Sequence, residues 1–446
     1  MKHRLITTGF LLCCALMQLP LHAQEQKSLT LGEAVQLSLT NSKQLKNSSA
    51  KIDEATAILQ QATDRKLPDF NINASYLRLT TPTISLKSNS SGGSDTSSGG
   101  SGFGSIKSAM YAMATISYPI YSGSRIKYGI ESAKYLQQAA KLDSAHDRGE
   151  VIINTIGAYI NLYKAGKAVD LVKENLTQSR QRDTDFSNLE KNGILARNDL
   201  LKAQLQTSNI ELSLLDAENN WKLANVNMDL LLGLPESTIL KLDSSSLQYS
   251  PELKTVDEYE QLAMQNRKDM LALSTRAKAA ASNIKSVKGE YYPSVGLTGG
   301  YAAINIPGLA TVTNAIDIGV GVKYSVSSLW KTKAKLKEAQ AKEDELVTSE
   351  EILVDDMHSQ VNRAYENYLS SVKKIDVYAK AIEQANENYK ITKNKYDNQL
   401  ATTTDLLEAD VAQLQAKLNY AFAKADAVVA YNTLIQTAGV LTEPTK

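Results

Sequence analysis

The stretch SVGLTGGYAAINIPGLATVTNAIDIGVGVKYS, residues 294–325, decides the fold, because its side chains alternate between apolar and polar. The apolar positions on one side are Val295, Leu297, Tyr301 and Ala303, and then Ile316, Ile318, Val320, Val322 and Tyr324. The other side is polar or small, for example Ser294, Thr298 and Asp317. A transmembrane barrel strand needs this alternation, because lipid lies on one face and water on the other. We expect two such strands, at about 294–304 and 315–326.

Two other structures fit part of this pattern. An ordinary sheet with one wet face gives the same alternation. A single membrane helix over 295–322 would have to bury Asn305, Asn314 and Asp317 and accommodate a Pro-Gly pair at its centre. Aromatic residues favour the barrel, since Tyr and Trp prefer the lipid–water boundary, although each alone is more often an ordinary packing residue. The candidates for this interface are Tyr76, Tyr118, Tyr301, Tyr324 and Trp330.

The same plan occurs earlier in the chain. TLGEAVQLSLTNS from Thr30 aligns with TVDEYEQLAMQNR from Thr255, and the offset still holds between Pro68 and Pro293. These prolines are the expected helix–strand junctions. A second alignment runs from Tyr118 to Gly233 without a gap, at a smaller offset. Constant offsets over such lengths indicate an internal two-fold repeat.

The two halves differ mainly by SNSSGGSDTSSGGSGFGS, residues 88–105, which is typical of a flexible surface loop. We expect a first repeat over 24–250, with strands at about 69–79 and 109–121, and a second over 251–446. Each repeat also holds a long helical hairpin. No proline occurs between 123 and 188, and a helix of ~65 residues would extend ~100 Å. Apolar residues from 405 to 438 follow coiled-coil spacing, as they would in a plain helical bundle.

The first residues are typical of a secretory signal peptide, residues 1–23: Lys2 and Arg4 precede an apolar run that ends in Ala23. A membrane anchor would need a longer run. Both cysteines, Cys13 and Cys14, lie in this segment, and neither follows the small residue that lipidation would require. The mature chain would therefore be exported, free of cysteine and independent of disulfides.

The composition argues against several classes of function. The net charge of +1 gives no reason to expect a nucleic acid partner. After cleavage only His146 and His358 remain, and no nucleophile, zinc or phosphate-loop motif accompanies them. The chain has 21 Tyr but only 5 Phe and 2 Trp, so a large globular core is not expected. We expect no enzyme, no cofactor and no bound metal.

One chain is not enough for a membrane barrel. Four strands cannot close, an open edge is not tolerated in lipid, and small closed barrels need ~8 strands. Two copies would give eight strands and three would give twelve, and these residues alone do not choose between them.

The chain resembles the TolC family of outer-membrane efflux proteins over essentially its whole mature length. The resemblance rests on the repeat, on the prolines before the strands, on LTLGEAVQLSLTNS, and on the turn motifs NGILARNDLLKAQ and NQLATTTDLLEAD. It implies an α+β membrane protein: a homotrimer with a twelve-stranded transmembrane barrel on a long α-helical coiled-coil barrel. Such a protein would lie in the outer membrane of a Gram-negative bacterium, with a long periplasmic extension.

The resemblance also implies partners and a gate. The partners would be two further copies, outer-membrane lipid, a periplasmic adaptor (membrane fusion) protein, and an inner-membrane pump such as an RND or ABC transporter, with efflux or type I secretion as the task. The helical turns would form a periplasmic tip that opens. Carboxylates of its constriction ring correspond to Asp405 and Glu408, and a tyrosine that holds the closed tip corresponds to Tyr396.

The same turns leave other interpretations open. Asp405 and Asp199 also suit the first turn of a helix, where the macrodipole favours a carboxylate. The turn glycine is kept as Gly193 but replaced by Gln399 in the second half, and a basic tip residue is replaced by Ala401. The alternative function is an exported coiled-coil structural or adhesin-like rod without a pore, which would explain the helices but not the paired strands.

Overall fold

The computed structural model describes residues 26–80, 107–243, 253–307 and 310–442. The expected signal peptide, both cysteines and the Gly/Ser-rich loop at 88–105 lie outside these residues. None of the described helices is both long and apolar enough to cross a membrane.

The elements come in the same order in both halves of the chain. The first half consists of β1 (Gln26–Leu29), α2 (Leu31–Asn41), α3 (Lys43–Asp64), β2 (Asp69–Arg78), β3 (Ser108–Tyr121), α4 (Arg125–Lys191) and α5 (Arg197–Leu232). The second consists of β4 (Ile239–Leu242), α6 (Val256–Asn266), α7 (Lys268–Lys288), the 3-10 turn Gly289–Tyr291, β5 (Ser294–Ile306), β6 (Ala310–Lys323), α8 (Ser328–Asp397) and α9 (Thr403–Thr437). The first helix of each half begins with the same capping box, Thr30 with Glu33 and Thr255 with Glu258.

The chain forms two compact units, and each takes residues from both halves. The first comprises the described residues up to Ser49, Asp143–Met270 and those from Leu353 onward; the second comprises Ala50–Leu142 and Leu271–Ile352.

The first unit is built on the hairpins α4–α5 and α8–α9. Its largest core surrounds Tyr159, whose hydroxyl donates to the carbonyls of Leu29 and Asp243 at 3.0 and 2.9 Å. These two carbonyls adjoin the short parallel pair β1–β4. A second core surrounds Met357 on α8. The first core holds mostly Leu, Ile, Val and Ala, whereas the second also buries Tyr259 and Tyr368.

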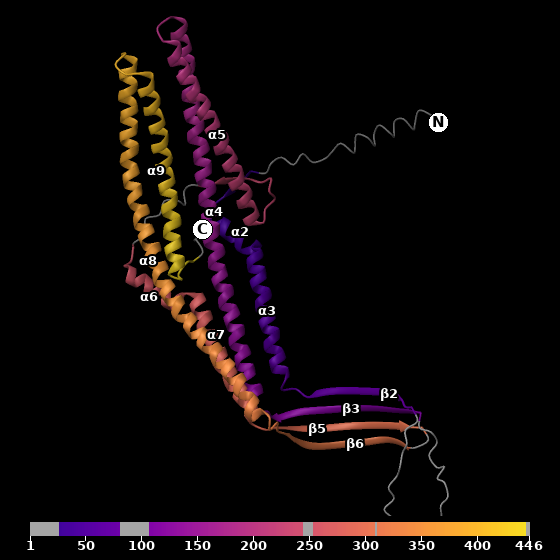
Figure 1. Ribbon diagram of the computed structural model, residues 1–446. Helices are drawn as coiled ribbons and strands as arrows, with labels where there is room; N and C mark the ends of the chain where they lie inside the picture. Colours follow the sequence, from indigo (N-terminus) through magenta and orange to yellow (C-terminus); the bar gives the residue numbers. More distant parts are fainter. Residues whose placement is uncertain (1–25, 81–106, 244–252, 308–309, 443–446) are drawn as a thin grey trace, which may run out of the picture. The chain divides into compact units, whose positions relative to one another are not determined.

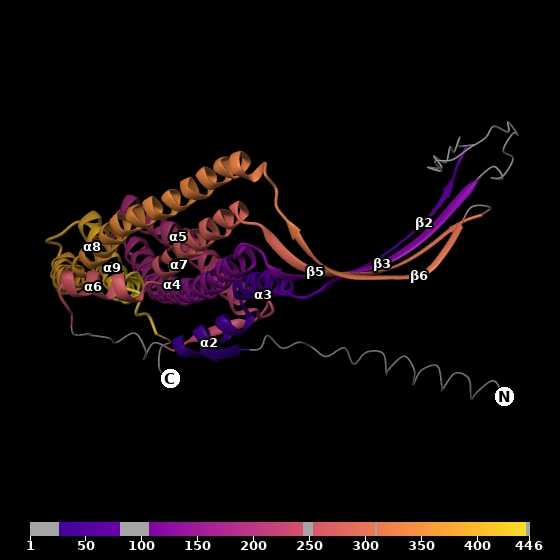
Figure 2. The same ribbon diagram turned by 90° about the horizontal axis from the view of Figure 1, so that it is seen from below.

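The second unit carries one antiparallel sheet in the order β2-β3-β5-β6, and the four strands run side by side in both views (Figures 1 and 2). The single-helix interpretation of 295–322 is therefore excluded, because this stretch forms β5 and β6. The fourth strand begins at Ala310 rather than near 315 and ends at Lys323, so Tyr324 lies one residue beyond it. A bulge explains the missed start: Thr313 and Asn314 oppose one residue of β5, and Asn314 takes a φ of 60°. The extra residue shifts the phase of the alternation.

Candidate functional site

The strand register joins the apolar positions of all four strands into one continuous face. One row across the sheet is Ile72, Ala114, Tyr301 and Ile316, and the next is Phe70, Ile116, Gly299 and Ile318. These side chains are open to the surroundings: Ile72 is 70% exposed and Ile318 is 85% exposed. An exposed apolar face of this kind is typical of a surface that an apolar partner covers.

Near the helices, the opposite face of the sheet is polar or small, with the rows Asp69, Ser117, Thr298 and Gly319, and then Asn71, Thr115, Gly300 and Asp317. Farther along the strands the same face also carries Met113, Tyr111, Ile304 and Val312. A Cβ added to Gly300 would lie 2.5 Å from the carboxylate of Asp317, so glycine makes room for that carboxylate. Near the helices the sheet therefore has one apolar face and one polar face. Its outer strands β2 and β6 have no neighbouring strand within the described residues.

The predicted interface aromatics are all exposed, but they lie at different heights on the sheet. Tyr118, Tyr324 and Trp330 lie at the end where the strands meet the helices, and Tyr76 lies toward the other end of β2. Tyr301 lies in the middle, and its hydroxyl donates to Oδ1 of Asn314 at 3.2 Å.

The two predicted junction prolines lie directly before the strands. Pro68 precedes β2 and Pro293 precedes β5. Proline suits the first residue before a strand, because it cannot continue a helix and gives no N–H to a ladder.

The turns at the hairpin ends have the same backbone although their sequences differ. Gly193 has a φ of 71° and Gln399 has a φ of 62°. In each turn the next residue donates its N–H five residues back, Ile194 to Leu189 at 2.9 Å and Leu400 to Lys395 at 2.8 Å. The loss of glycine has therefore not changed the turn. It leaves a glutamine in the left-handed region, where a side chain is strained.

Asp405 caps the first turn of α9, as the helix-terminus interpretation predicted. Its carboxylate accepts from the N–H and the hydroxyl of Thr402, both at 2.8 Å. These hydrogen bonds, first of all that from the Thr402 N–H, hold the pKa of Asp405 below its usual value. Glu408 lies one turn further along and is exposed. Asp199 lies in the first turn of α5 and pairs with Lys202 at 3.3 Å instead of capping.

Tyr396 connects the two hairpins near their ends. Its ring stacks on Phe186 of α4 with centroids 5.5 Å apart. Both rings belong to a small apolar cluster that includes Leu200 of α5 and Leu406 of α9. Burial in this cluster raises the pKa of Tyr396. Tyr396 thus contacts the other hairpin through Phe186, a partner that the sequence did not indicate, and its role in closing the tip stays a prediction.

A buried ion pair near the same end was missed by the sequence analysis. Arg182 of α4 donates to Asp410 of α9 at 2.6 Å, and Asn175 donates to the other carboxylate oxygen at 3.1 Å. Arg182 is 8% exposed and Asp410 is 1% exposed. One difference between the two halves could have indicated this pair. In the repeat alignment the charged Arg182 corresponds to the neutral Asn388, and the charged Asp410 corresponds to the neutral Gln204.

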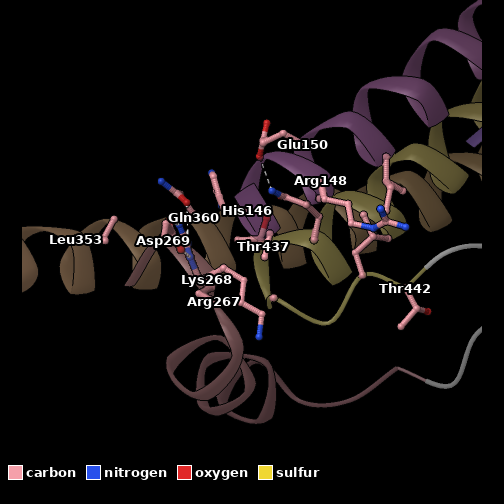
Figure 3. Close-up of a pocket in the computed structure, with 16 residues that line it drawn as sticks. His146, Arg148, Glu150, Arg267, Lys268, Asp269, Leu353, Gln360, Thr437 and Thr442 are labelled. Carbon is pink, nitrogen blue, oxygen red and sulfur yellow. Dashed lines mark hydrogen bonds and ion pairs between the residues drawn. The ribbon is translucent and has the colours of Figure 1, made fainter. Parts of the chain in front are cut away.

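A polar cleft of about 870 Å³ lies in the first unit, where the α6–α7 junction meets α4, α8 and the end of α9 (Figure 3). Arg267 bridges Asp269 and Gln360 there, at 2.6 and 2.9 Å. Burial alone would raise the pKa of Asp269, but the Arg267 guanidinium holds it below its usual value. On the other side of the lining, Glu150 accepts from the Gln436 amide at 2.6 Å. The described residues contain no group of three metal-ligating side chains.

Known proteins give a consistent picture of this architecture. The family model described as outer membrane efflux protein matches residues 34–234 and 260–440. Among solved structures, the outer membrane protein VceC from Vibrio cholerae is 18% identical, with a TM-score of 0.74 over 92% of this chain and 96% of that one. The CmeC outer membrane channel from Campylobacter jejuni is 19% identical, with a TM-score of 0.74 over 92% and 85% of the two chains.

A third similar structure is the open state of the MtrE outer membrane channel from Neisseria gonorrhoeae. It is 16% identical, with a TM-score of 0.73 over 92% of this chain and 88% of that one. Among the curated proteins, none matches the sequence significantly.

Proposed function

Because the chain belongs to the outer membrane efflux protein family, of which the TolC-like channels are the structural relatives, we propose that it is the exit duct of a tripartite efflux or type I secretion system. It is an efflux channel of the outer membrane of Gram-negative cells, with a helical extension in the periplasm. The proposal concerns how the channel is assembled, what it works with and where it opens.

The observation that carries the proposal is the two-faced sheet with two open edges. Four strands cannot close a barrel, and unpaired strand edges are not tolerated in lipid. We propose that three copies join β2 of one chain to β6 of the next, so that twelve strands close around a pore. The rows with Ile72 and Phe70 would then face lipid, and the rows with Asn71 and Asp69 would line water.

The gate is proposed to lie at the ends of the hairpins. Contacts between the two hairpins hold this end together within one chain, above all Arg182 with Asp410 and Phe186 with Tyr396. Three copies each of Asp405 and Glu408 around one axis would form an anionic constriction that favours cations. Gly193 and Asp199 would shape the neighbouring turn. The cap role of Asp405 is compatible with this ring, because only one of its oxygens makes the capping hydrogen bonds.

The proposed partners follow from the duct. A periplasmic adaptor would join the hairpin ends to an inner-membrane pump of the RND or ABC type. The genes beside this one provide a direct test, because an adjacent adaptor and an adjacent pump are expected.

Planar bilayer recording tests the function itself. Purified protein in detergent should run as a heat-resistant oligomer and should insert with discrete conductance steps. Asp405→Ala with Glu408→Ala should reduce cation preference at low salt. A soluble monomeric rod that never conducts would instead support the structural or adhesin-like alternative.

A further inference from the structure

The basic charge of this protein is concentrated where the strands meet the helices. The four segments at this junction are 64–69, 125–127, 285–290 and 323–337, all in the second unit. They contain 11 Lys and Arg against 3 Asp and Glu, whereas the whole chain has a net charge of +1. The rest of the chain is therefore net negative. We call the Lys and Arg residues of these four segments the basic collar.

Contacts within the second unit join three of the four segments of the collar, namely 125–127, 285–290 and 323–337. Ser286 donates to the carbonyl of Arg125 at 3.1 Å. Lys127 and Lys285 both lie 5.5 Å from the ring centroid of Tyr128. Glu290 accepts from Lys335 at 2.8 Å. Apart from this glutamate, the collar is not neutralised: among the described residues, Lys331, Lys333 and Lys337 have no acidic partner within 4 Å.

The start of α8 shows which way part of the collar faces. Thr332 is buried and donates to Glu290, and Ala339 is buried on the same side of the helix. Trp330, Lys333 and Lys337, three and four residues apart, lie on a neighbouring exposed stripe of the helix. Trp330 is 62% exposed. An exposed tryptophan one turn from free lysines is typical of an element at a membrane surface, where the ring lies among headgroups and the lysines reach the phosphates.

This surface continues directly into the apolar face of the sheet. Val322 of β6 is exposed, and so are Val326 and Leu329 in the segment that leads into α8. On this side the order along the chain is apolar strand, Trp330, then Lys331, Lys333 and Lys337, whereas Lys323 of the collar ends β6 on the polar face of the sheet. Lipid chains, the glycerol region and headgroup phosphates follow each other in that order across a leaflet.

We propose that the basic collar binds the phosphate groups of anionic phospholipids in the leaflet nearest the helices, with Trp330, Lys333 and Lys337 at its centre. The inference rests on the proposed membrane placement of the sheet and adds a lipid preference to it. Anionic headgroups complement the charge of the collar, because Lys and Arg residues near an anionic membrane surface are attracted to it. A second copy of the chain is a poorer occupant of this patch, because its own collar carries the same charge.

Trp330 serves as the reporter, because the chain has only 2 Trp and Trp221→Phe leaves it alone. The variant is reconstituted in phosphatidylcholine vesicles that contain a minor fraction of phosphatidylglycerol, with bromine on the acyl chains of one lipid or the other. Quenching then reports the lipid composition around Trp330. We expect phosphatidylglycerol to be enriched about twofold or more over the bulk and the enrichment to fall with added sodium chloride.

Lys333→Gln with Lys337→Gln should abolish most of the enrichment without loss of the heat-resistant oligomer. Lys390→Gln with Lys393→Gln, on the same helix but at the hairpin, is the matched control and should leave it unchanged. Equal enrichment in both double variants, or quenching in proportion to the bulk lipid, overturns the proposal while the membrane placement stands. Loss of the preference on adding inorganic phosphate at constant ionic strength would indicate a free-anion site instead. No quenching by either lipid would overturn the collar and the membrane placement together.

Discussion

Asp410→Asn should separate the two helical hairpins and open the channel. The substitution keeps the shape of the side chain but leaves the Arg182 guanidinium buried without a counter-charge, and one of its nitrogens, Nη1, already lacks a partner. Removing one partner of a buried ion pair costs about 3–5 kcal/mol. Once the hairpins part, water hydrates Arg182, so this cost is relieved only in the separated state. The equilibrium should shift toward separation by about two to four orders of magnitude.

The double variant Arg182→Met with Asp410→Leu tests the cause. It removes both charges and fills most of the site with apolar groups. The Asn175 amide loses its acceptor, but this costs only about 1–3 kcal/mol, less than an unpaired buried charge, so most of the contact between the hairpins should return. Glu174→Gln is the matched control. It breaks the exposed pair of Glu174 with Lys417, which joins the same two helices at 3.3 Å. An exposed pair of this kind contributes only ~0–1 kcal/mol.

Two readouts are needed, one for geometry and one for conduction. The mature chain is expected to have no cysteine, so spin labels on cysteines placed at the exposed Ile194 and Leu400 report the hairpin distance without background. Bilayer recording gives the open probability. Asp410→Asn should lengthen the distance and raise the open probability. The reasoning is refuted if neither quantity changes, or if Glu174→Gln changes them as much.

Three further predictions concern single features of the chain. Gln399→Gly should stabilise the α8–α9 turn by about 1 kcal/mol, seen as slower amide exchange, whereas Gly193→Ala should cost a similar amount; equal exchange in all variants would contradict the strain at Gln399. Burial, with Glu236 nearby, raises the pKa of Asp229 to about 6, so its charged form opposes folding above that pH. Asp229→Asn should therefore raise the unfolding temperature at pH 7.5 and lose this advantage below pH ~4, where the carboxyl is protonated in both states; a constant advantage would be the wrong outcome. Asp405→Ala with Glu408→Ala should lower the cation/anion permeability ratio in a salt gradient, and an unchanged reversal potential would remove both residues from the constriction.

Local pattern carried most of the information about the sheet. Alternation with period two is set by the strand itself, and it identified the four segments that form β2, β3, β5 and β6. It missed the first residues of β6, because the bulge at Asn314 adds a residue and reverses the phase. Helix capping also depends on residues close in the sequence. Thr402 and Asp405 are three residues apart, and in the structure they are joined by hydrogen bonds.

Contacts between segments that lie far apart in the chain could not be predicted from the sequence. Arg182 and Asp410 each resemble the charged residues of a solvated helix face, and nothing near either one shows that the other lies opposite. The stacking of Phe186 on Tyr396 is of the same kind, because it depends on how the hairpins pack. The backbone of Gln399 could not be predicted for a different reason. The turn imposes a left-handed conformation that glutamine does not favour, so the residue type does not indicate it.

The central claim is that each chain supplies four strands to a barrel shared by three copies. It is tested most directly by disulfide cross-linking of the two edge strands, with one cysteine introduced in β2 and one in β6 on the polar face, scanned over neighbouring positions. The account predicts that one register cross-links efficiently in the membrane and that the denatured products form a ladder that ends at three chains. A ladder that continues beyond three, a product that ends at two, or the absence of any inter-chain product would contradict it.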